Sequence, residues 1–168
     1  MKKGWFLGGS AVLFSADQVL KRYAEQNIDK GKERKLTDHI VMRRVHNKGM
    51  CLNLLDSHPE VVRALSLGAA SVLSLIQIFY RFRGGSFLKN KAISLAAAGA
   101  WSNTFDRCAR GYVVDYIGIK CGNEKVSAVT YNLGDFFIAG GGLLFLLASL
   151  FPGRKKQRTA GKVHQTEK

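Results

Sequence analysis

The sequence predicts an all-α integral membrane protein with four transmembrane helices and a small β-rich cap on the extracytoplasmic side. Three observations support this fold class. Most of the 26 Lys and Arg residues lie in four blocks, at residues 20–48, 81–91, 107–125 and 154–168. Four uncharged, mostly apolar stretches alternate with these blocks. Basic residues that flank apolar segments are typical of membrane proteins, and 168 residues leave room for one such domain.

The uncharged stretches are Gly4–Ala16, Ala64–Tyr80, Ala92–Phe105 and Phe136–Leu150. A membrane span needs about 20 mostly apolar residues. We therefore expect helices at about residues 4–21, 60–81, 91–107 and 132–151, and three of them reach this length by including an acidic residue at one end. Short apolar runs also occur as buried helices of soluble proteins. Four of them between basic clusters favour the membrane.

Residues 1–152 are predicted to form the single membrane-embedded domain, and residues 153–168 a basic, disordered cytoplasmic tail. Basic residues near the spans indicate the orientation. They place the N-terminus, residues 81–91 and the tail in the cytoplasm. The first loop, residues 21–61, opposes this rule because it holds nine Lys and Arg residues and would lie outside. A cleaved signal peptide is disfavoured, since Phe14 stands where a small residue is expected.

The predicted outer loops contain strand-like segments. Residues 111–119 and 126–131 are rich in β-branched and aromatic residues, which favours short strands. Residues 36–55 are a third candidate. Together they predict the β-rich cap.

Four aspartates are predicted to gather near the outer membrane face. Asp17 and Asp106 end helices that run outward, Asp135 begins one that runs inward, and Asp115 follows in the outer loop. Each acid on its own could simply mark where a helix leaves the bilayer. Four acids at one level favour a functional site, because ionisable groups at membrane depth are costly.

Polar side chains accompany these acids at helical spacing. Asn103 lies three residues before Asp106, and Asn132 lies three before Asp135, so each pair shares a helix face. Asp17 and Lys21 have the spacing of an i, i+4 ion pair, which is also compatible with a purely structural role. Small residues at 96–99 and 140–142 predict close helix packing.

Other classes of function find less support. The net charge of +14 is compatible with nucleic-acid binding, but no zinc-finger or RNP-like motif is present. The three cysteines, Cys51, Cys108 and Cys121, form no CxxC pair and predict neither a zinc site nor a complete disulfide framework. No nucleic-acid partner and no zinc site are therefore expected.

Five short motifs between residues 17 and 142 resemble, in order and spacing, those of the lipoprotein signal peptidases (signal peptidase II). None is specific alone, but the series is. They are Asp17-Gln-Val-Leu-Lys21, His46-Asn47-Lys48-Gly49, Ser102-Asn103-Thr104-Phe105-Asp106-Arg107, Val113-Val114-Asp115 and Tyr131-Asn132-Leu133-Gly134-Asp135.

The resemblance implies an aspartyl endopeptidase that removes signal peptides from diacylglyceryl-modified prolipoproteins, cleaving just before the lipidated cysteine. Asp115 and Asp135 would be the catalytic pair, without metal or cofactor. Supporting or substrate-binding roles would fall on Asp17, Lys21, Asn47, Gly49, Asn103, Asp106, Arg107 and Asn132. The partners would be the lipidated prolipoprotein and membrane lipid, and the location the bacterial cytoplasmic (inner) membrane, with the active site near its extracytoplasmic face.

Two other hypotheses remain open from the residues themselves. A small membrane transporter would also gather acids near one face, and would show ion-dependent uptake without peptide cleavage. A non-catalytic membrane scaffold would tolerate replacement of Asp115 and Asp135. A metal-carboxylate hydrolase is disfavoured, because it would need metal for activity.

Overall fold

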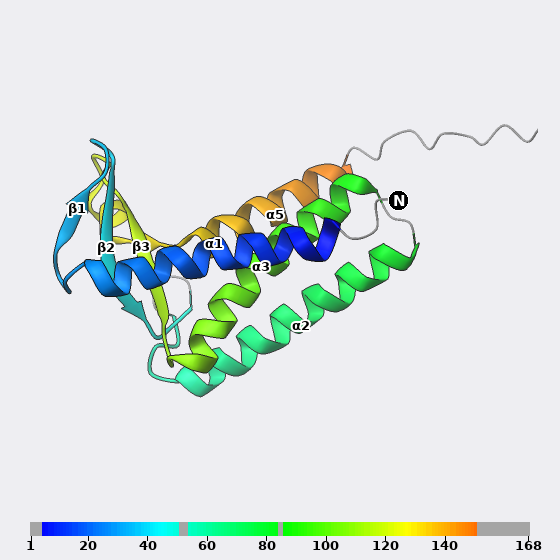
Figure 1. The fold of residues 1–168 in the computed structure, drawn as a ribbon, viewed down its shortest axis with the longest axis horizontal. Helices are drawn as coiled ribbons and strands as arrows, with labels where there is room; N and C mark the ends of the chain where they lie inside the picture. The colour runs from blue at the N-terminus through cyan, green and yellow to red at the C-terminus, as the bar shows by residue number, and fades with distance from the viewer. Residues whose placement is uncertain (1–4, 51–53, 84–85, 151–168) are drawn as a thin grey trace, which may run out of the picture.

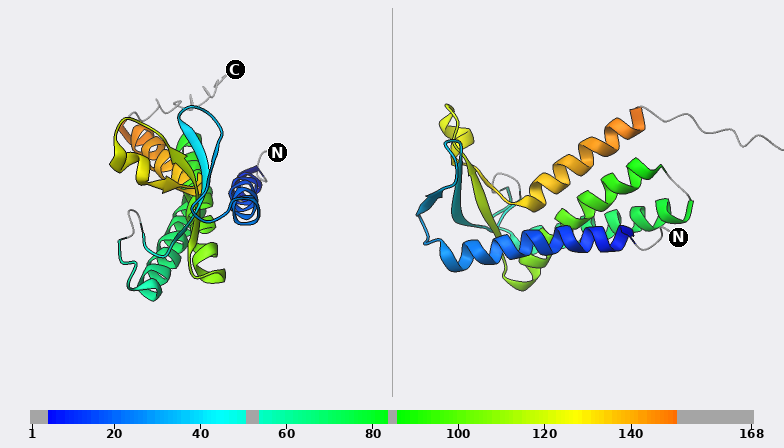
Figure 2. Two further views of the ribbon diagram at one scale, coloured as in Figure 1. Left: turned by 90° about the vertical axis from the view of Figure 1, so that its left-hand side faces the viewer. Right: turned by 45° about the horizontal axis from the view of Figure 1, so that its top comes forward.

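The computed structural model describes residues 5–50, 54–83 and 86–150. Four long helices extend from one side of a small antiparallel sheet (Figures 1 and 2). The helices are α1 (Trp5–Asn27), α2 (Pro59–Arg83), α3 (Phe87–Ala109) and α5 (Leu133–Leu150). The sheet consists of β1 (Glu33–Lys35), β2 (Ile40–Asn47), β3 (Val113–Ile119) and β4 (Thr130–Tyr131), with the short helix α4 (Glu124–Ala128) before β4. The predicted tail, residues 153–168, lies outside the described residues.

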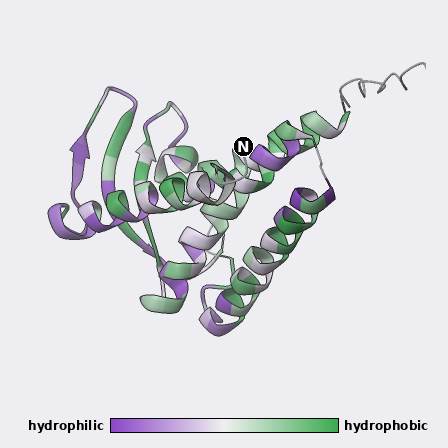
Figure 3. Cartoon of the chain, turned by 45° about the vertical axis from the view of Figure 1, so that its right-hand side comes forward, coloured by the Kyte–Doolittle hydropathy of each residue, from purple (hydrophilic) through white to green (hydrophobic). Residues whose placement is uncertain are grey.

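Two helices of the described chain, α2 and α5, are long and apolar enough to cross a membrane. Their large apolar side chains are mostly exposed, as at Leu75 (65%), Phe82 (85%) and Leu146 (62%). Figure 3 shows hydrophobic colouring along the middle of α2 and hydrophilic colouring at the end that leads to α3. Soluble monomers rarely expose apolar surface on this scale, so these faces are suited to lipid. The helices α1 and α3 do not meet the same criterion by themselves.

Helix α3 is the centre of the bundle, because it packs against α1, α2 and α5. Its buried face is made of small residues, including Ala92, Ala96 and Gly99. Small residues let helix backbones approach closely, which is how helices associate where burial from water does not drive them. The predicted small-residue contacts are thus confirmed between α3 and α5. A Cβ at Gly99 would lie 2.2 Å from the Gly134 carbonyl oxygen.

The sheet has the order β1-β2-β3-β4, and every neighbouring pair is antiparallel. In the β2–β3 pair, Ile40 lies opposite Ile119 and Asn47 opposite Val113, with an irregularity between Met42 and Val45. Strands were expected at residues 36–55 and 111–119, and β2 and β3 lie within these ranges. Their register brings the last residues of β2 beside the first half of β3, with Val45 opposite Asp115.

Two local expectations were wrong. Helix α1 continues to Asn27, past the expected end near residue 21, because Ala24 and the following Ile28 pack against Met42, Val114 and Tyr116 of the sheet. Within the segment 126–131, only Thr130–Tyr131 forms a strand, and α4 occupies its beginning. The side chain of Asn123 accepts a hydrogen bond from the Val126 amide, and this N-cap favours the helix over the β propensity of the sequence.

The α3–α5 contact yields a stability prediction with a matched control. A Cβ at Gly141 would lie 2.6 Å from the Ala92 carbonyl oxygen and 2.7 Å from the Ala96 amide nitrogen, whereas a Cβ at Gly142 would meet nothing within 4 Å. Gly141→Ala should therefore destabilise the protein by about 1–3 kcal/mol, and Gly142→Ala should not. Thermal unfolding of both variants in detergent measures this difference, and equal melting temperatures would contradict the close α3–α5 packing.

Candidate active site

Asn132 joins the two aspartates that lie at the sheet–bundle junction. It precedes α5 as its N-cap residue, and Asp135 is the third residue of that helix. The Asp135 amide donates to Asn132 Oδ1 (3.0 Å), and the Asn132 amide donates to Asp135 Oδ2 (3.0 Å). This reciprocal arrangement is a capping box. The remaining amide nitrogen of the side chain, Asn132 Nδ2, donates to Asp115 Oδ1 at 2.6 Å.

Asp115 lies in the middle of β3 and is almost completely buried, with 3% of its surface exposed. Its second oxygen, Oδ2, accepts a hydrogen bond from Asn47 Nδ2 at 3.0 Å. Burial, and then the neighbouring charge of Asp135, raises the pKa of Asp115 from 3.8 to about 7, although the hydrogen bonds from Asn47 and Asn132 act in the opposite direction. A carboxyl group with this pKa can hold or release a proton near neutral pH.

The loop after β2 is held across the site by two contacts. The Gly49 amide donates to Asn47 Oδ1 (3.0 Å), which turns the chain and leaves Asn47 Nδ2 for Asp115. Arg107 Nη2, near the end of α3, donates to the Gly49 carbonyl oxygen at 2.8 Å. Beyond the end of α3, Gly111 has a φ of +79°, a conformation that favours glycine. This conformation lets the chain turn from α3 into β3.

Asn103 connects Asp135 to a second group of charges deeper in the bundle. Its Nδ2 donates to Asp135 Oδ1 (2.9 Å), and its Oδ1 accepts from Lys21 Nζ (2.8 Å). The Lys21 ammonium group also forms ion pairs with Asp17 (3.0 Å) and Asp106 (3.1 Å), and all three side chains are fully buried. One cation between two acids leaves a net negative charge, which Arg110 balances by pairing with Asp106 (2.9 Å).

The two carboxylates of this buried cluster accept further hydrogen bonds. Asp17 accepts hydrogen bonds from Ser102 Oγ (2.6 Å) and from the Tyr116 hydroxyl (2.9 Å). Asp106 accepts from Gln18 Nε2 (3.1 Å) and the Val114 amide (3.2 Å). Burial and the charge of Asp17 raise the pKa of Tyr116, so its hydroxyl stays protonated and donates. The cluster thereby ties α1, α3 and β3 together.

The structure brings all ten candidate residues from the sequence into one connected network. Sequence reasoning missed Gln18, Ser102, Arg110 and Tyr116, which complete that network. Arg110 stands four residues after Asp106, a spacing that indicates an ion pair. Tyr116 carries no such signal, because its partner Asp17 is 99 residues away. His46 lies outside the network, where it contacts Glu25 and stacks on Tyr112 at 4.0 Å between ring centroids.

Among residues 5–50, 54–83 and 86–150, no group of three or more His, Cys, Asp or Glu side chains is arranged to hold a metal ion. Cys108 and Cys121 are free thiols, and Cys51 lies outside the described residues.

The family model of signal peptidase (SPase) II matches residues 10–151. The chain belongs to this family. It is 32% identical to the lipoprotein signal peptidase of Caldicellulosiruptor bescii over 140 aligned residues. This alignment covers 83% of this chain and 87% of that protein. It is 30% identical over 148 residues to the lipoprotein signal peptidase of Shewanella oneidensis, covering 87% of this chain and 86% of that protein. The predicted resemblance to this family is confirmed.

Two solved structures share the fold, and each is described as a bacterial membrane enzyme. The first, at 2.3 Å resolution, has a TM-score of 0.78 and 20% identity, and covers 96% of this chain and 97% of that one. The second, at 1.9 Å resolution, has a TM-score of 0.74 and 20% identity, and covers 89% and 95%. Signal peptidase II membership thus agrees with the fold of bacterial membrane enzymes.

Removing the buried cation should be costly, and a second substitution should relieve the cost. Lys21→Met leaves Asp17 and Asp106 buried without their shared partner, and breaking a buried ion pair in this way costs about 3–5 kcal/mol. The double variant Asp17→Asn/Lys21→Met restores charge balance and should be more stable than Lys21→Met alone. Melting temperatures in detergent form the double-mutant cycle, and strict additivity would show that the two residues are not coupled.

Proposed function

We propose that this chain is a membrane aspartyl endopeptidase that removes signal peptides from diacylglyceryl-modified prolipoproteins and cleaves just before the lipidated cysteine. Membership of the signal peptidase II family and the relatives named lipoprotein signal peptidase support the reaction. One observation supports the assignment of the catalytic pair. Asp115 and Asp135, 20 residues apart in the chain, both bind Asn132, and Asp135 contributes to the raised pKa of Asp115.

In the proposed mechanism, Asp115 and Asp135 share one proton. Two neighbouring carboxyl groups with little access to water cannot both ionise readily, so they titrate as a unit. The ionised member removes a proton from the attacking water, and the protonated member donates a hydrogen bond to the scissile carbonyl oxygen. When the tetrahedral intermediate collapses, a proton passes to the leaving amine. The pair then returns to its singly protonated state.

The remaining candidates act through position. Asn132 donates hydrogen bonds to both carboxyl groups, and Asn103 donates one to Asp135. We therefore propose that these two residues orient the pair. Asn47, Gly49 and Arg107 lie beside Asp115 and are proposed to border the path of the substrate. The buried cluster of Asp17, Lys21 and Asp106 is proposed to support the site from within the bundle.

We further propose four membrane spans within a single domain, residues 1–152, with the sheet on the extracytoplasmic side of the bacterial cytoplasmic membrane. The apolar exposed faces of α2 and α5 support two of the spans. For α1 and α3, the charged side chains at membrane depth are buried and paired, which is how such groups are tolerated there. The basic residues at the end of α2, at the start of α3 and in the tail favour the cytoplasmic side for the opposite ends.

The proposed substrate reaches the carboxyl pair from the lipid. An apolar signal helix and a diacylglyceryl group are both soluble in the bilayer and need no aqueous path. Helix α2 packs mainly against α3, which leaves much of its apolar surface open to the membrane. Membrane lipid is thus the proposed medium through which the precursor arrives.

Replacing each aspartate of the carboxyl pair by asparagine, which removes the charge at nearly the same side-chain shape, tests the pair. Asp115→Asn and Asp135→Asn should each lower kcat by about 100- to 10,000-fold, because either change removes the general acid–base function. Asp38→Asn is the matched control, since Asp38 is exposed and pairs with Lys35 in the cap. Cleavage of a synthetic diacylglyceryl-modified precursor by the purified enzymes is the measurement. A wild-type rate from folded Asp135→Asn would exclude the pair.

The pH dependence follows from the raised pKa of Asp115. As pH rises through about 7, the pair loses its shared proton, so kcat should decline on the alkaline side. The same pKa has a consequence for stability. Between about pH 4 and pH 7 the folded protein binds a proton that the unfolded chain has released, so stability falls as pH rises across this interval.

The variant Asp115→Asn separates these two effects. Its side chain cannot ionise, so the fall in melting temperature between mildly acidic and mildly alkaline solution should be smaller than in the wild type. A wild-type slope in this variant would show that Asp115 does not titrate in this range, independently of any activity measurement.

A further inference from the structure

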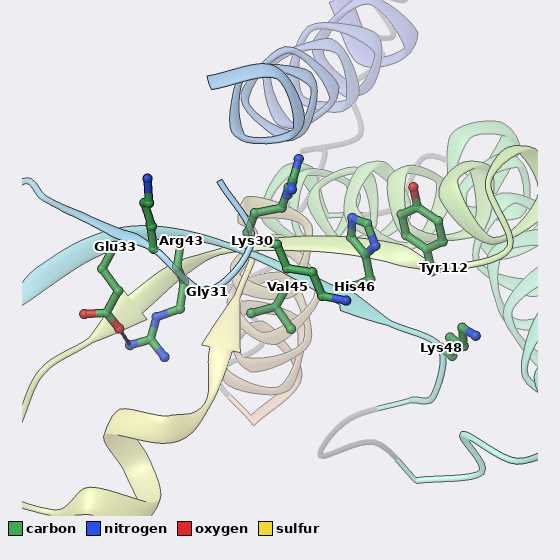
Figure 4. Close-up of a pocket in the computed structure, with 10 residues that line it drawn as sticks. Lys30, Gly31, Glu33, Arg43, Val45, His46, Lys48 and Tyr112 are labelled. Carbon is green, nitrogen blue, oxygen red and sulfur yellow. Dashed lines mark ion pairs between the residues drawn. The ribbon is translucent and has the colours of Figure 1, made fainter. Parts of the chain in front are cut away.

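A basic pocket of about 630 Å³ lies in the cap, away from the buried charge cluster. We call it the cap pocket. Figure 4 shows its lining along β2, from the Glu33–Arg43 ion pair at one end to Tyr112 and Lys48 at the other. Its lining residues are Lys30, Gly31, Lys32, Glu33, Arg43, Arg44, Val45, His46, Lys48 and Tyr112. Five of them are Lys or Arg, and one is acidic.

The positive charge of the cap pocket is only partly balanced. Lys32 pairs with Asp29, and Arg43 pairs with Glu33. Arg44 donates to the backbone carbonyl oxygen of Glu25, which carries no full charge. In the described part of the chain, Lys30 and Lys48 have no ion-pair partner, and both are exposed. The Glu25 carboxylate contacts His46, and Arg44 acts on the charge of Asp29. An anion placed in this pocket would therefore meet two cations, Lys30 and Lys48, that have no carboxylate partner among the described residues.

Strand β2 contributes both to the cap pocket and to the surroundings of the proposed catalytic pair. Val45, which lines the pocket, lies opposite Asp115 in the sheet. Asn47, which donates to Asp115, stands between the lining residues His46 and Lys48. Strand β1 pairs with β2 only at Val41–Arg43, and no other described strand pairs with that edge. An extended peptide that leaves the carboxyl pair along this edge would run toward the pocket.

We propose that the cap pocket binds acidic side chains in the mature segment of the precursor, a few residues after the scissile bond. This inference rests on the proposed function. The part of the substrate on the far side of that bond from the signal helix is the part that can lie on the cap. The pocket would then act as a specificity site that favours Asp or Glu over neutral or basic residues at those positions.

A phosphate-bearing lipid headgroup has the same charge, but the position of the pocket favours the peptide. The exposed apolar faces suited to lipid lie on α2 and α5, which contribute no residue to the pocket. The pocket is instead built from the loop after α1, from β1 and β2, and from Tyr112. The proposal also gives a role to the first loop, whose basic charge opposes the usual distribution across the membrane.

The test uses the purified full-length enzyme in bicelles at 0.15 M salt, where charges further apart than about 8 Å are largely screened. Three synthetic diacylglyceryl-modified precursor peptides differ only in two residues a few positions after the cysteine, which are Asp-Glu, Asn-Gln or Lys-Lys. The wild type should cleave the acidic peptide with a kcat/KM about fivefold above that of the neutral one, the size expected for one or two partly exposed ion pairs. The basic peptide should be the poorest substrate.

Two charge reversals in the cap form the matched comparison. Lys30→Glu, in the pocket, should abolish or invert the ratio of kcat/KM between the acidic and neutral peptides. Lys35→Glu makes the same charge change at an exposed residue outside the pocket, which pairs with Asp38, and should keep the wild-type ratio. Because each variant is compared with itself on two peptides, a change in the amount of folded enzyme cancels.

The outcomes distinguish this inference from the proposed function. Equal kcat/KM for all three peptides, or the same ratio in Lys30→Glu as in the wild type, would overturn the inference and leave the peptidase assignment in place. Activity on every peptide that rises with the anionic lipid content of the bicelles, and loses that dependence in Lys30→Glu, would assign the pocket to lipid headgroups instead. Cleavage of none of the peptides by the wild type would overturn the function itself.

Discussion

The capping box between Asn132 and Asp135 is the constraint on which the site depends. Helix α5 needs an acceptor for its free amides, and Asn132 supplies it while its own amide is bound by Asp135. The same side chain has one nitrogen left, and that nitrogen holds Asp115. A feature that stabilises the start of a helix therefore also sets the position of both members of the proposed catalytic pair. Strand β3 and helix α5 cannot move apart without breaking it.

Behind this pair lies a buried cluster whose charges balance. Lys21 sits between Asp17 and Asp106, and Arg110 compensates the second acid. Polar groups inside a membrane bundle are tolerated when every charge and every donor has a partner. Because Asn103 contacts both Lys21 and Asp135, the cluster and the carboxyl pair form one hydrogen-bonded network. The proposed chemistry at the bundle end is thus supported by residues deeper in the helices.

The cap and the bundle differ in the chemistry of their surfaces. The bundle exposes apolar side chains on α2 and α5 and packs internally through small residues of α3. The cap carries much of the basic charge of the first loop and has a core of its own against the end of α1. The proposed substrate contains both kinds of surface, since an apolar signal helix and a polar mature segment meet at the scissile bond. The carboxyl pair lies where the two surfaces of the protein meet.

The sequence by itself determined the mostly helical class, the approximate helix positions, and strands β2 and β3, because apolar runs and motif spacing depend on neighbours along the chain. It also named ten candidate residues for the site. It also indicated family membership. Only the tertiary structure decided that Asn132 bridges Asp115 and Asp135, that Tyr116 binds Asp17, and that basic residues of the first loop line a pocket in the cap. These contacts join residues up to 99 positions apart. Periodicity cannot register them, because sheet register and helix packing set which distant side chains meet.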